Sequence, residues 1–227
     1  MKTRREFLKT IGVLSAGTMV LQAFPSCMNK KEIGLQLYTL RDTIGKDTLN
    51  TLQQVSKIGY RHIEPYGFDG NFFGIPALEF RQIVEDLGMR ITSTHTGITS
   101  ENADAYLEAA SRTGMEYIVL PSPGGRPASS ANDVKKMAEE MNIIGEKSRI
   151  AGIRFGYHNH DREFKSESGK MFYDILLHET DPDLVCFELD IFWIIKGGCD
   201  PVAYFLKYPG RFALWHVKDM DLWVKAQ

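Results

Sequence analysis

The chain has 227 residues, of which 43% are hydrophobic and 25% are charged, as in an ordinary globular protein. Its formal net charge of −2 gives no electrostatic basis for binding nucleic acid or an anionic membrane surface. The three cysteines, at positions 27, 186 and 199, have no CxxC spacing, so we expect neither a thiolate zinc site nor a disulfide framework. This length is enough for one large domain or two small ones.

The first thirty residues are expected to be an export signal. Arg4-Arg5, followed by Phe7 and Leu8, is a twin-arginine pattern, and an apolar run at residues 11–24 comes after it. That run is too short for a membrane span, which needs roughly 20 residues. Cys27 stands at a loose lipoprotein cleavage site, and a cytoplasmic N-terminal helix is the alternative. We therefore expect a periplasmic protein, attached to a membrane only through this signal or a lipid, with its folded domain at residues 31–227.

After the signal, strand-like and helix-like segments alternate. β-branched and apolar runs predict strands at residues 33–38, 62–64, 90–95, 116–120, 153–158, 185–193 and 212–216. Amphipathic runs that Gly or Pro delimits predict helices at residues 47–58, 76–87, 102–113, 132–150, 170–179 and 201–208.

This alternation implies a parallel sheet with right-handed crossovers. A doubly wound sheet is the alternative, but no G-x-G-x-x-G motif follows the first strand. We therefore predict an α/β fold, a (β/α)₈ TIM barrel. Such barrels typically take about 250 residues, so we expect this one to be incomplete and to lack its eighth strand.

Polar side chains mark the ends of three successive predicted strands. Glu188 and Asp190 lie on the same side of the sixth strand, where a buried carboxylate is costly unless a cation pairs with it. Asp190, His216 on the next strand and His158 on the previous one offer oxygen and imidazole ligands. Together they predict a site for one divalent ion, Mn, Zn, Co or Mg. A helix cap at Asp190 and a core histidine at position 216 are the alternatives.

Other residues at the strand ends are candidates for catalysis and for sugar binding. His160 and Glu188 are candidate bases, and Lys218 could neutralise an oxyanion or form a salt bridge. Glu64 and His95 end the second and third strands and are expected to line a sugar-binding cup with His160, Trp193 and Lys218. Solvated or loop-bonded side chains are the alternative for Glu64 and for the histidines.

Aromatic residues could form an apolar wall against a sugar face, or simply pack in the core. Glu163 could hold a ligating imidazole, or lie exposed at the start of a helix. The candidates for the wall are Tyr38, Phe72, Phe73, Trp193 and Trp215.

Segments with these residues resemble the xylose-isomerase-like TIM-barrel superfamily, which includes sugar phosphate isomerases and epimerases and the family 2 AP endonucleases. They cover nearly all of the chain after the signal, at residues 33–38, 59–64, 156–161, 188–190 and 214–219. In the epimerase branch, the ends of strands five to eight hold one metal with Glu, Asp, His and Glu. Asp190 and His216 match the central pair, His158 stands at the first Glu position, and the last Glu would lie beyond Gln227.

The resemblance implies a metal-dependent sugar isomerase or epimerase that transfers a proton next to a carbonyl. A lyase or hydrolase acting on 3-keto-glycosides in glycan breakdown is an alternative use of the same chemistry. An inactive, truncated sugar-binding barrel is the non-catalytic alternative. A small-molecule sugar is the expected partner, a homo-oligomer is possible, and the export pattern and net charge argue against DNA repair.

Overall fold

The computed structural model describes residues 33–122 and 128–218. The predicted export signal, including Cys27, lies outside these residues. Within the two described ranges, no helix is both long enough and apolar enough to cross a membrane.

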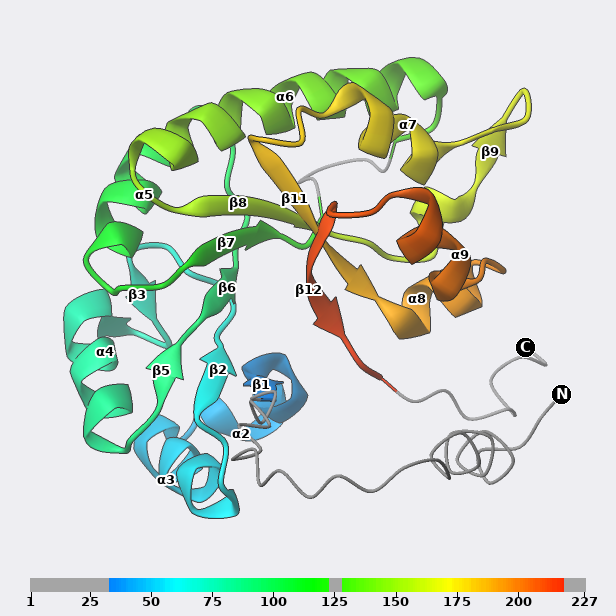
Figure 1. Ribbon diagram of the computed structural model, residues 1–227. Helices are drawn as coiled ribbons and strands as arrows, with labels where there is room; N and C mark the ends of the chain where they lie inside the picture. The colour runs from blue at the N-terminus through cyan, green and yellow to red at the C-terminus, as the bar shows by residue number, and fades with distance from the viewer. Residues whose placement is uncertain (1–32, 123–127, 219–227) are drawn as a thin grey trace, which may run out of the picture. The chain divides into compact units, whose positions relative to one another are not determined.

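Parallel strands form a sheet that curls around an interior, and the chain visits them in spatial order (Figure 1). The third strand is in two pieces because it is interrupted at Thr92, whose N–H donates to Ile63 and whose carbonyl accepts from Glu116 and Tyr117. The strands of this sheet in the described residues are β1 (Gly34–Gln36), β2 (His62–Glu64), β5 (Arg90–Ile91) with β6 (Ser93–His95), β7 (Tyr117–Leu120), β8 (Arg154–His158), β11 (Val185–Asp190) and β12 (Phe212–His216). The predicted incomplete TIM barrel is therefore confirmed.

Helices cover the outer face of this sheet (Figure 1). Local sequence explains their ends: Asp47 caps the first, Gly59 ends it with φ 112°, and Ser130 and Asp133 form a capping box on the longest. A Cβ on Gly145 would stand 2.6 Å from the Leu184 carbonyl oxygen, so glycine lets that helix approach the start of β11. The covering helices are α3 (Thr48–Ile58), α4 (Ala77–Asp86), α5 (Ala103–Ser111), α6 (Ala131–Ile150), α7 (Phe172–Glu179) and α9 (Pro201–Lys207).

The loops contain short helices and strands that the sequence pattern does not predict. They are η1 (Leu37–Leu40), α2 (Arg41–Ile44), the hairpin of β3 (Asn71–Phe72) and β4 (Ile75–Pro76), η2 (Arg162–Phe164), the hairpin of β9 (Ser166–Glu167) and β10 (Lys170–Met171), and α8 (Ile191–Lys196).

The predicted extension of the sixth strand to Trp193 is wrong. β11 ends at Asp190, whose side chain accepts a hydrogen bond from the Trp193 backbone N–H at 3.0 Å. This N-cap starts α8, because a carboxylate satisfies an N–H that lacks a partner inside the helix.

β11 shows how alternation divides the core from the site. Val185, Phe187 and Leu189 belong to the main hydrophobic core with the covering helices. Cys186 instead packs with Tyr117 and Val119 in a separate small cluster. Glu188 and Asp190 share the side of Cys186, as the period of two predicts, and are 2% and 0% exposed.

The curled sheet is open between its first and last strands, β1 and β12, which pair with β2 and β11 but not with each other in the described residues. A cavity of about 300 Å³ lies along this opening and is lined by β1, β2, β11 and β12, among others. Glu64 and Glu188 both reach its wall, together with Gln36 and His216 at the ends of β1 and β12.

Candidate active site

A cavity of about 420 Å³, here called the cup, lies at the carboxyl ends of the strands, the end where barrel enzymes place their active sites. Six of its lining residues are predicted from the sequence: Tyr38, His95, His158, His160, Trp193 and Lys218. The full lining is Gln36, Tyr38, Tyr66, Gly67, His95, Thr96, Gly97, Pro121, His158, His160, Trp193 and Lys218.

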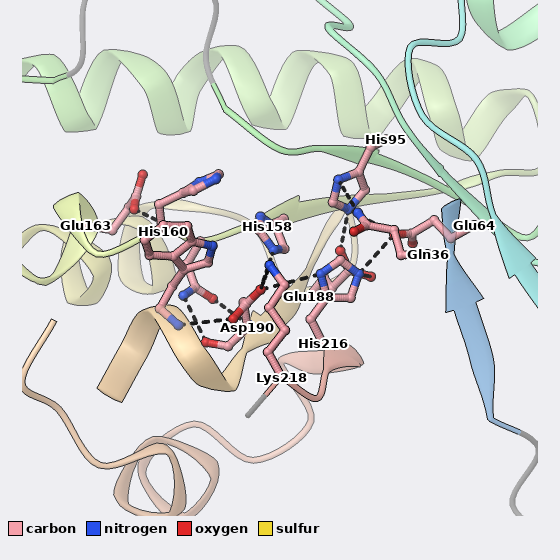
Figure 2. A network of polar contacts seen from close by, with 12 residues as sticks. Gln36, Glu64, His95, His158, His160, Glu163, Glu188, Asp190, His216 and Lys218 are labelled. Carbon is pink, nitrogen blue, oxygen red and sulfur yellow. Dashed lines mark hydrogen bonds and ion pairs between the residues drawn. The ribbon is translucent and has the colours of Figure 1, made fainter. Parts of the chain in front are cut away.

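The three predicted metal-binding side chains come together next to the cup, which His158 lines, and Figure 2 shows them pointing toward one another. Asp190 Oδ2 lies 3.2 Å from His158 Nε2 and 3.6 Å from His216 Nδ1. Lys218 Nζ approaches the same oxygen at 3.1 Å. We call His158, Asp190 and His216 the cation group, because their ligand atoms lie within 4.8 Å of one another.

A second cluster, here called the lower ring, lies beneath the cup and alternates carboxylates with imidazoles. Its members are Glu64, His95, Glu188 and His216. Of these, only His216 also belongs to the cation group. His95 Nε2 lies 2.6 Å from Glu188 and 3.2 Å from Glu64. His216 Nε2 lies 2.9 Å from Glu64 and 3.3 Å from Glu188.

The lower ring is also held from outside. The Ser93 hydroxyl donates a hydrogen bond to Glu64 Oε2. Gln36, at the end of β1, places its side-chain amide 3.0 Å from His95 Nδ1. Gln36 therefore joins the ring to the wall of the cup.

Burial and nearby charges distribute the protons of the two clusters unevenly. Burial alone raises the pKa of Glu64 and of Asp190, but neighbouring histidines, and Lys218 for Asp190, bring both well below their usual ranges. Burial, with the charge of Glu64, raises the pKa of Glu188 well above its usual range. Glu64 and Asp190 thus lose their protons more readily than ordinary carboxylic acids, whereas Glu188 holds its proton more strongly.

The histidines also differ in their pKa values: three have a lowered pKa and one has a raised pKa. Burial lowers the pKa of His95, His158 and His160 to about 4, so these imidazoles are neutral. Burial also acts to lower the pKa of His216, but the carboxylates of Asp190, Glu64 and Glu188 outweigh it and raise the value to about 10. In the metal-free protein His216 is therefore an imidazolium between carboxylates.

Glu163 proves to be buried, with 5% exposure, and it does not contact a ligating imidazole. Its carboxylate accepts hydrogen bonds from the Tyr157 hydroxyl at 2.7 Å and from the His160 backbone N–H at 2.8 Å. The Arg162 guanidinium lies 3.4 Å away. Glu163 thus holds the turn that carries His160 into the cup.

Asn159 holds the backbone of Asp190 in place, and the sequence-based predictions assign it no role. Its side-chain oxygen accepts from the Asp190 N–H at 3.0 Å, and its amide lies 3.4 Å from the Asp190 carbonyl. Its position between His158 and His160 is the signal that could have found it. Gln36 could have been found as the polar residue that ends an apolar strand.

Several predicted residues lie elsewhere than expected. Glu64 and Glu188 do not line the cup; they face the cavity below it. Of the aromatic residues, Tyr38 and Trp193 line the cup, whereas Phe72 is fully buried against Phe68 and Phe80. The other two also pack outside the cup: Phe73 contacts Tyr66 and Phe80, and Trp215 contacts Phe205 of α9.

The residues of the cation group fit a divalent ion. One carboxylate and two imidazoles are ligands of the kind that Zn, Mn and Co accept. The buried Nδ1 atoms of His158 and His160 also have no hydrogen-bond partner among the described residues. Such polar atoms next to a cavity are the positions that a ligand or water would satisfy.

A sequence profile described as the xylose isomerase-like TIM barrel matches residues 52–225. A solved sugar phosphate isomerase/epimerase from Parabacteroides distasonis is 33% identical, with a TM-score of 0.75, over 89% of this chain and 80% of that one.

Two further relatives are more distant. A xylose isomerase-like TIM barrel protein from Mycobacterium smegmatis, solved in complex with magnesium, is 16% identical, with a TM-score of 0.60, over 87% of this chain and 79% of that one, so it shares the fold. An inosose dehydratase from Lacticaseibacillus casei is 26% identical over 95 residues, which are 42% of this chain. That match spans only 31% of the dehydratase.

Proposed function

Because this chain belongs to the xylose isomerase-like TIM barrel family, we propose that it is an enzyme that transfers a proton next to the carbonyl of a sugar. The observation that carries the proposal is the position of the cation group. His158 lines a cavity large enough for a monosaccharide, with aromatic side chains in its walls, and Asp190 and His216 gather around His158 next to that cavity. Ligands of mixed oxygen and nitrogen type beneath a sugar-sized cup support sugar chemistry assisted by one divalent ion.

The cation group would hold the ion through Asp190 Oδ2, His158 Nε2 and His216 Nδ1. A divalent ion supplies positive charge that polarises a carbonyl or hydroxyl oxygen. Lys218, whose Nζ is 3.1 Å from Asp190, adds a cation at the edge of the same cup and favours negative charge on a sugar oxygen.

His160 is the proposed base. Its ring lines the cup and packs against Trp193, with 5.2 Å between ring centroids. Its pKa of about 4, lowered mainly by burial, leaves a neutral imidazole with a lone pair that can accept a proton. Delivery of a proton to the opposite face of the same carbon gives epimerisation. Delivery to the neighbouring carbon, with transfer of a proton from the hydroxyl oxygen to the former carbonyl oxygen, gives isomerisation. Neither reaction needs an oxidant or a reductant.

The first test is the metal content of the purified protein by elemental analysis. We expect about one divalent ion per chain in the wild type, and a loss of that ion in His158→Gln and His216→Gln. The matched control is His178→Gln, because His178 lies on α7 and contacts Tyr208 rather than the cup. A wild type without bound ion, or three variants that keep it equally, would refute the metal assignment.

The second test is proton exchange. Ketoses and aldoses incubated with the protein in deuterated water should gain deuterium at the carbon next to the carbonyl, as seen by NMR. His160→Gln should reduce this exchange by about 100-fold or more if it is the base, with the ion still bound. Exchange at the wild-type rate in His160→Gln would remove His160 from that role.

Elimination from a keto sugar is a second candidate, and the match to inosose dehydratase favours it. It would begin with the same proton removal, after which a group leaves from the adjacent carbon as water or an alcohol. A 3-keto-glycoside would then show new alkene signals and a released group in NMR. Deuterium in recovered, intact sugar would instead indicate isomerisation or epimerisation.

The remaining predictions concern a non-catalytic role and export. A sugar-binding barrel without enzyme activity would bind sugar but show neither a stoichiometric ion nor proton exchange. We also propose export through the twin-arginine pattern at Arg4-Arg5. Replacing both arginines with lysine should retain the protein in the cytoplasm in a fractionation experiment.

A further inference from the structure

The two carboxylates of the lower ring, Glu64 and Glu188, have no direct part in the proposed chemistry. Glu64 and Glu188 are 7% and 2% exposed and lie outside the lining of the cup. Neither carboxylate therefore forms part of the wall of the cup. Both carboxylates contact the imidazoles of His95 and His216.

His216 links the lower ring to the cation group through its two nitrogens. Nε2 faces the lower ring and lies 2.9 Å from Glu64 Oε1, a hydrogen-bond distance. Nδ1 faces Asp190 Oδ2 at 3.6 Å, on the side of the cup. Figure 2 shows the ring of His216 between these two carboxylates.

This arrangement decides which nitrogen keeps its proton. A charged carboxylate only accepts hydrogen bonds, so the nitrogen facing Glu64 must carry N–H. An imidazole that binds a cation needs a lone pair on the other nitrogen, and a hydrogen bond to a carboxylate commonly fixes that choice. With the proton on Nε2, the nitrogen available to a cation is Nδ1, beside Asp190.

Glu64 is itself held in place. Ser93 Oγ, from β6 next to it, donates to Glu64 Oε2, and Oε1 is left for His216. Glu64 and His216 come from β2 and β12, which are 152 positions apart in the chain. Their contact therefore depends on the curvature of the whole sheet.

We propose that Glu64 is a positioning residue that holds the Nε2 proton of His216 and turns Nδ1 toward the cation group. This role rests on the proposed metal site, and it replaces the sugar contact that the sequence predicts for Glu64.

The test compares Glu64→Gln with Glu163→Gln, which removes the charge of another buried carboxylate that does not contact His216. Zinc and manganese affinities are measured by competition with a chelator. We expect Glu64→Gln to weaken the affinity by about 10- to 100-fold, and Ser93→Ala to weaken it less. Glu163→Gln should stay close to the wild type. Glu64→Asp, which restores a carboxylate, should recover part of the loss.

A second readout does not depend on metal binding. Imidazole NMR of the wild type should show a slowly exchanging Nε2 proton on His216, assigned by its absence in His216→Gln. That proton should exchange rapidly with water in Glu64→Gln and remain slow in Glu163→Gln. If the wild type binds no ion but shows this pattern, the proposed metal site fails while the contact of Glu64 with His216 stands.

Three outcomes would overturn the proposal. One is an unprotected Nε2 proton in the wild type. Another is a Glu64→Gln variant that binds ions normally but loses affinity for sugar, which would restore the sugar-binding role. The third is a wild type with two ions per chain and a Glu64→Gln variant with one, which would make the lower ring a second metal site.

Discussion

The cup and the lower ring are built from the same residue types but differ in what remains available for chemistry. In the cup, two imidazole nitrogens lack partners among the described residues, and Lys218 is 46% exposed. In the lower ring, every Nε2 faces a carboxylate at hydrogen-bond or ion-pair distance. Residue type alone therefore does not tell which side chains can act on a ligand. Side chains that are exposed, or that have polar atoms without a partner, can do so, whereas side chains whose polar atoms are paired hold their neighbours in place.

The largest expected effect is at Asp190, which serves two purposes with two oxygens. Oδ1 caps α8 and Oδ2 faces the cation group. Asp190→Asn keeps a good N-cap but loses the charge, so ion affinity should fall by more than about 100-fold while the cap persists. Asp190→Ala should lose the ion and also about 1 kcal/mol of cap stability.

Chelator competition and urea unfolding of the two Asp190 variants separate these effects. The difference between them in free energy of unfolding isolates the cap, because both lack the charge. Equal stability of the two variants would contradict the capping role, and normal ion binding in Asp190→Asn would contradict the ligand role.

A smaller and opposite effect on the ion is expected at Lys218. Its ammonium competes with a cation for Asp190 Oδ2, so Lys218→Met should tighten ion binding by about 2- to 5-fold. Turnover should fall by about 10-fold or more, since a cation at the edge of the cup is lost. Lys196→Met is the matched control: Lys196 also lies over the Trp193 ring, at 4.7 Å, but contacts Asp161 instead of Asp190.

Steady-state kinetics and ion titrations on both lysine variants test this prediction. Weaker ion binding in Lys218→Met would indicate that the lysine supports the site instead of competing for it. A loss of turnover in Lys196→Met as large as that in Lys218→Met would assign the effect to the Trp193 wall.

The smallest expected effect is on the support of His160. Tyr157→Phe removes one hydrogen bond to the buried Glu163 carboxylate and should lower the free energy of unfolding by about 1–2 kcal/mol. The ion affinity should change by less than about 2-fold, because Tyr157 contacts none of the ligands. Urea unfolding and chelator competition measure the two quantities. A loss of ion binding larger than the loss of stability would show that this support extends to the cation group.

The regular part of this architecture could be predicted from sequence because it follows local periodicity. Strand and helix runs alternate, and Asp190 and His216 sit one βα unit apart, so they end at the same level; the structure pairs them directly. The position of Glu188 could be predicted in the same way. It lies two residues before Asp190 on β11, so its side chain is one layer further from the carboxyl end, and its neighbour on β12 is Leu214.

The remaining features depend on long-range geometry or on ambiguous local signals. The contact of Glu64 with His216 requires the sheet to curl until β2 faces β12, which no local pattern contains. The apolar run after Asp190 fits a strand or a helix equally well, and the cap on Trp193 decides it. The strands and covering helices of the barrel could thus be predicted from the sequence, whereas α8 and the division between cup and lower ring could not.

In α8, which Asp190 caps, the backbone and the side chain of Trp193 have separate roles. Its backbone N–H anchors the aspartate, and any residue except proline can supply that group. Its indole forms part of the wall of the cup. Substitutions at this position would therefore change the wall of the cup while the carboxylate of Asp190 keeps its anchor.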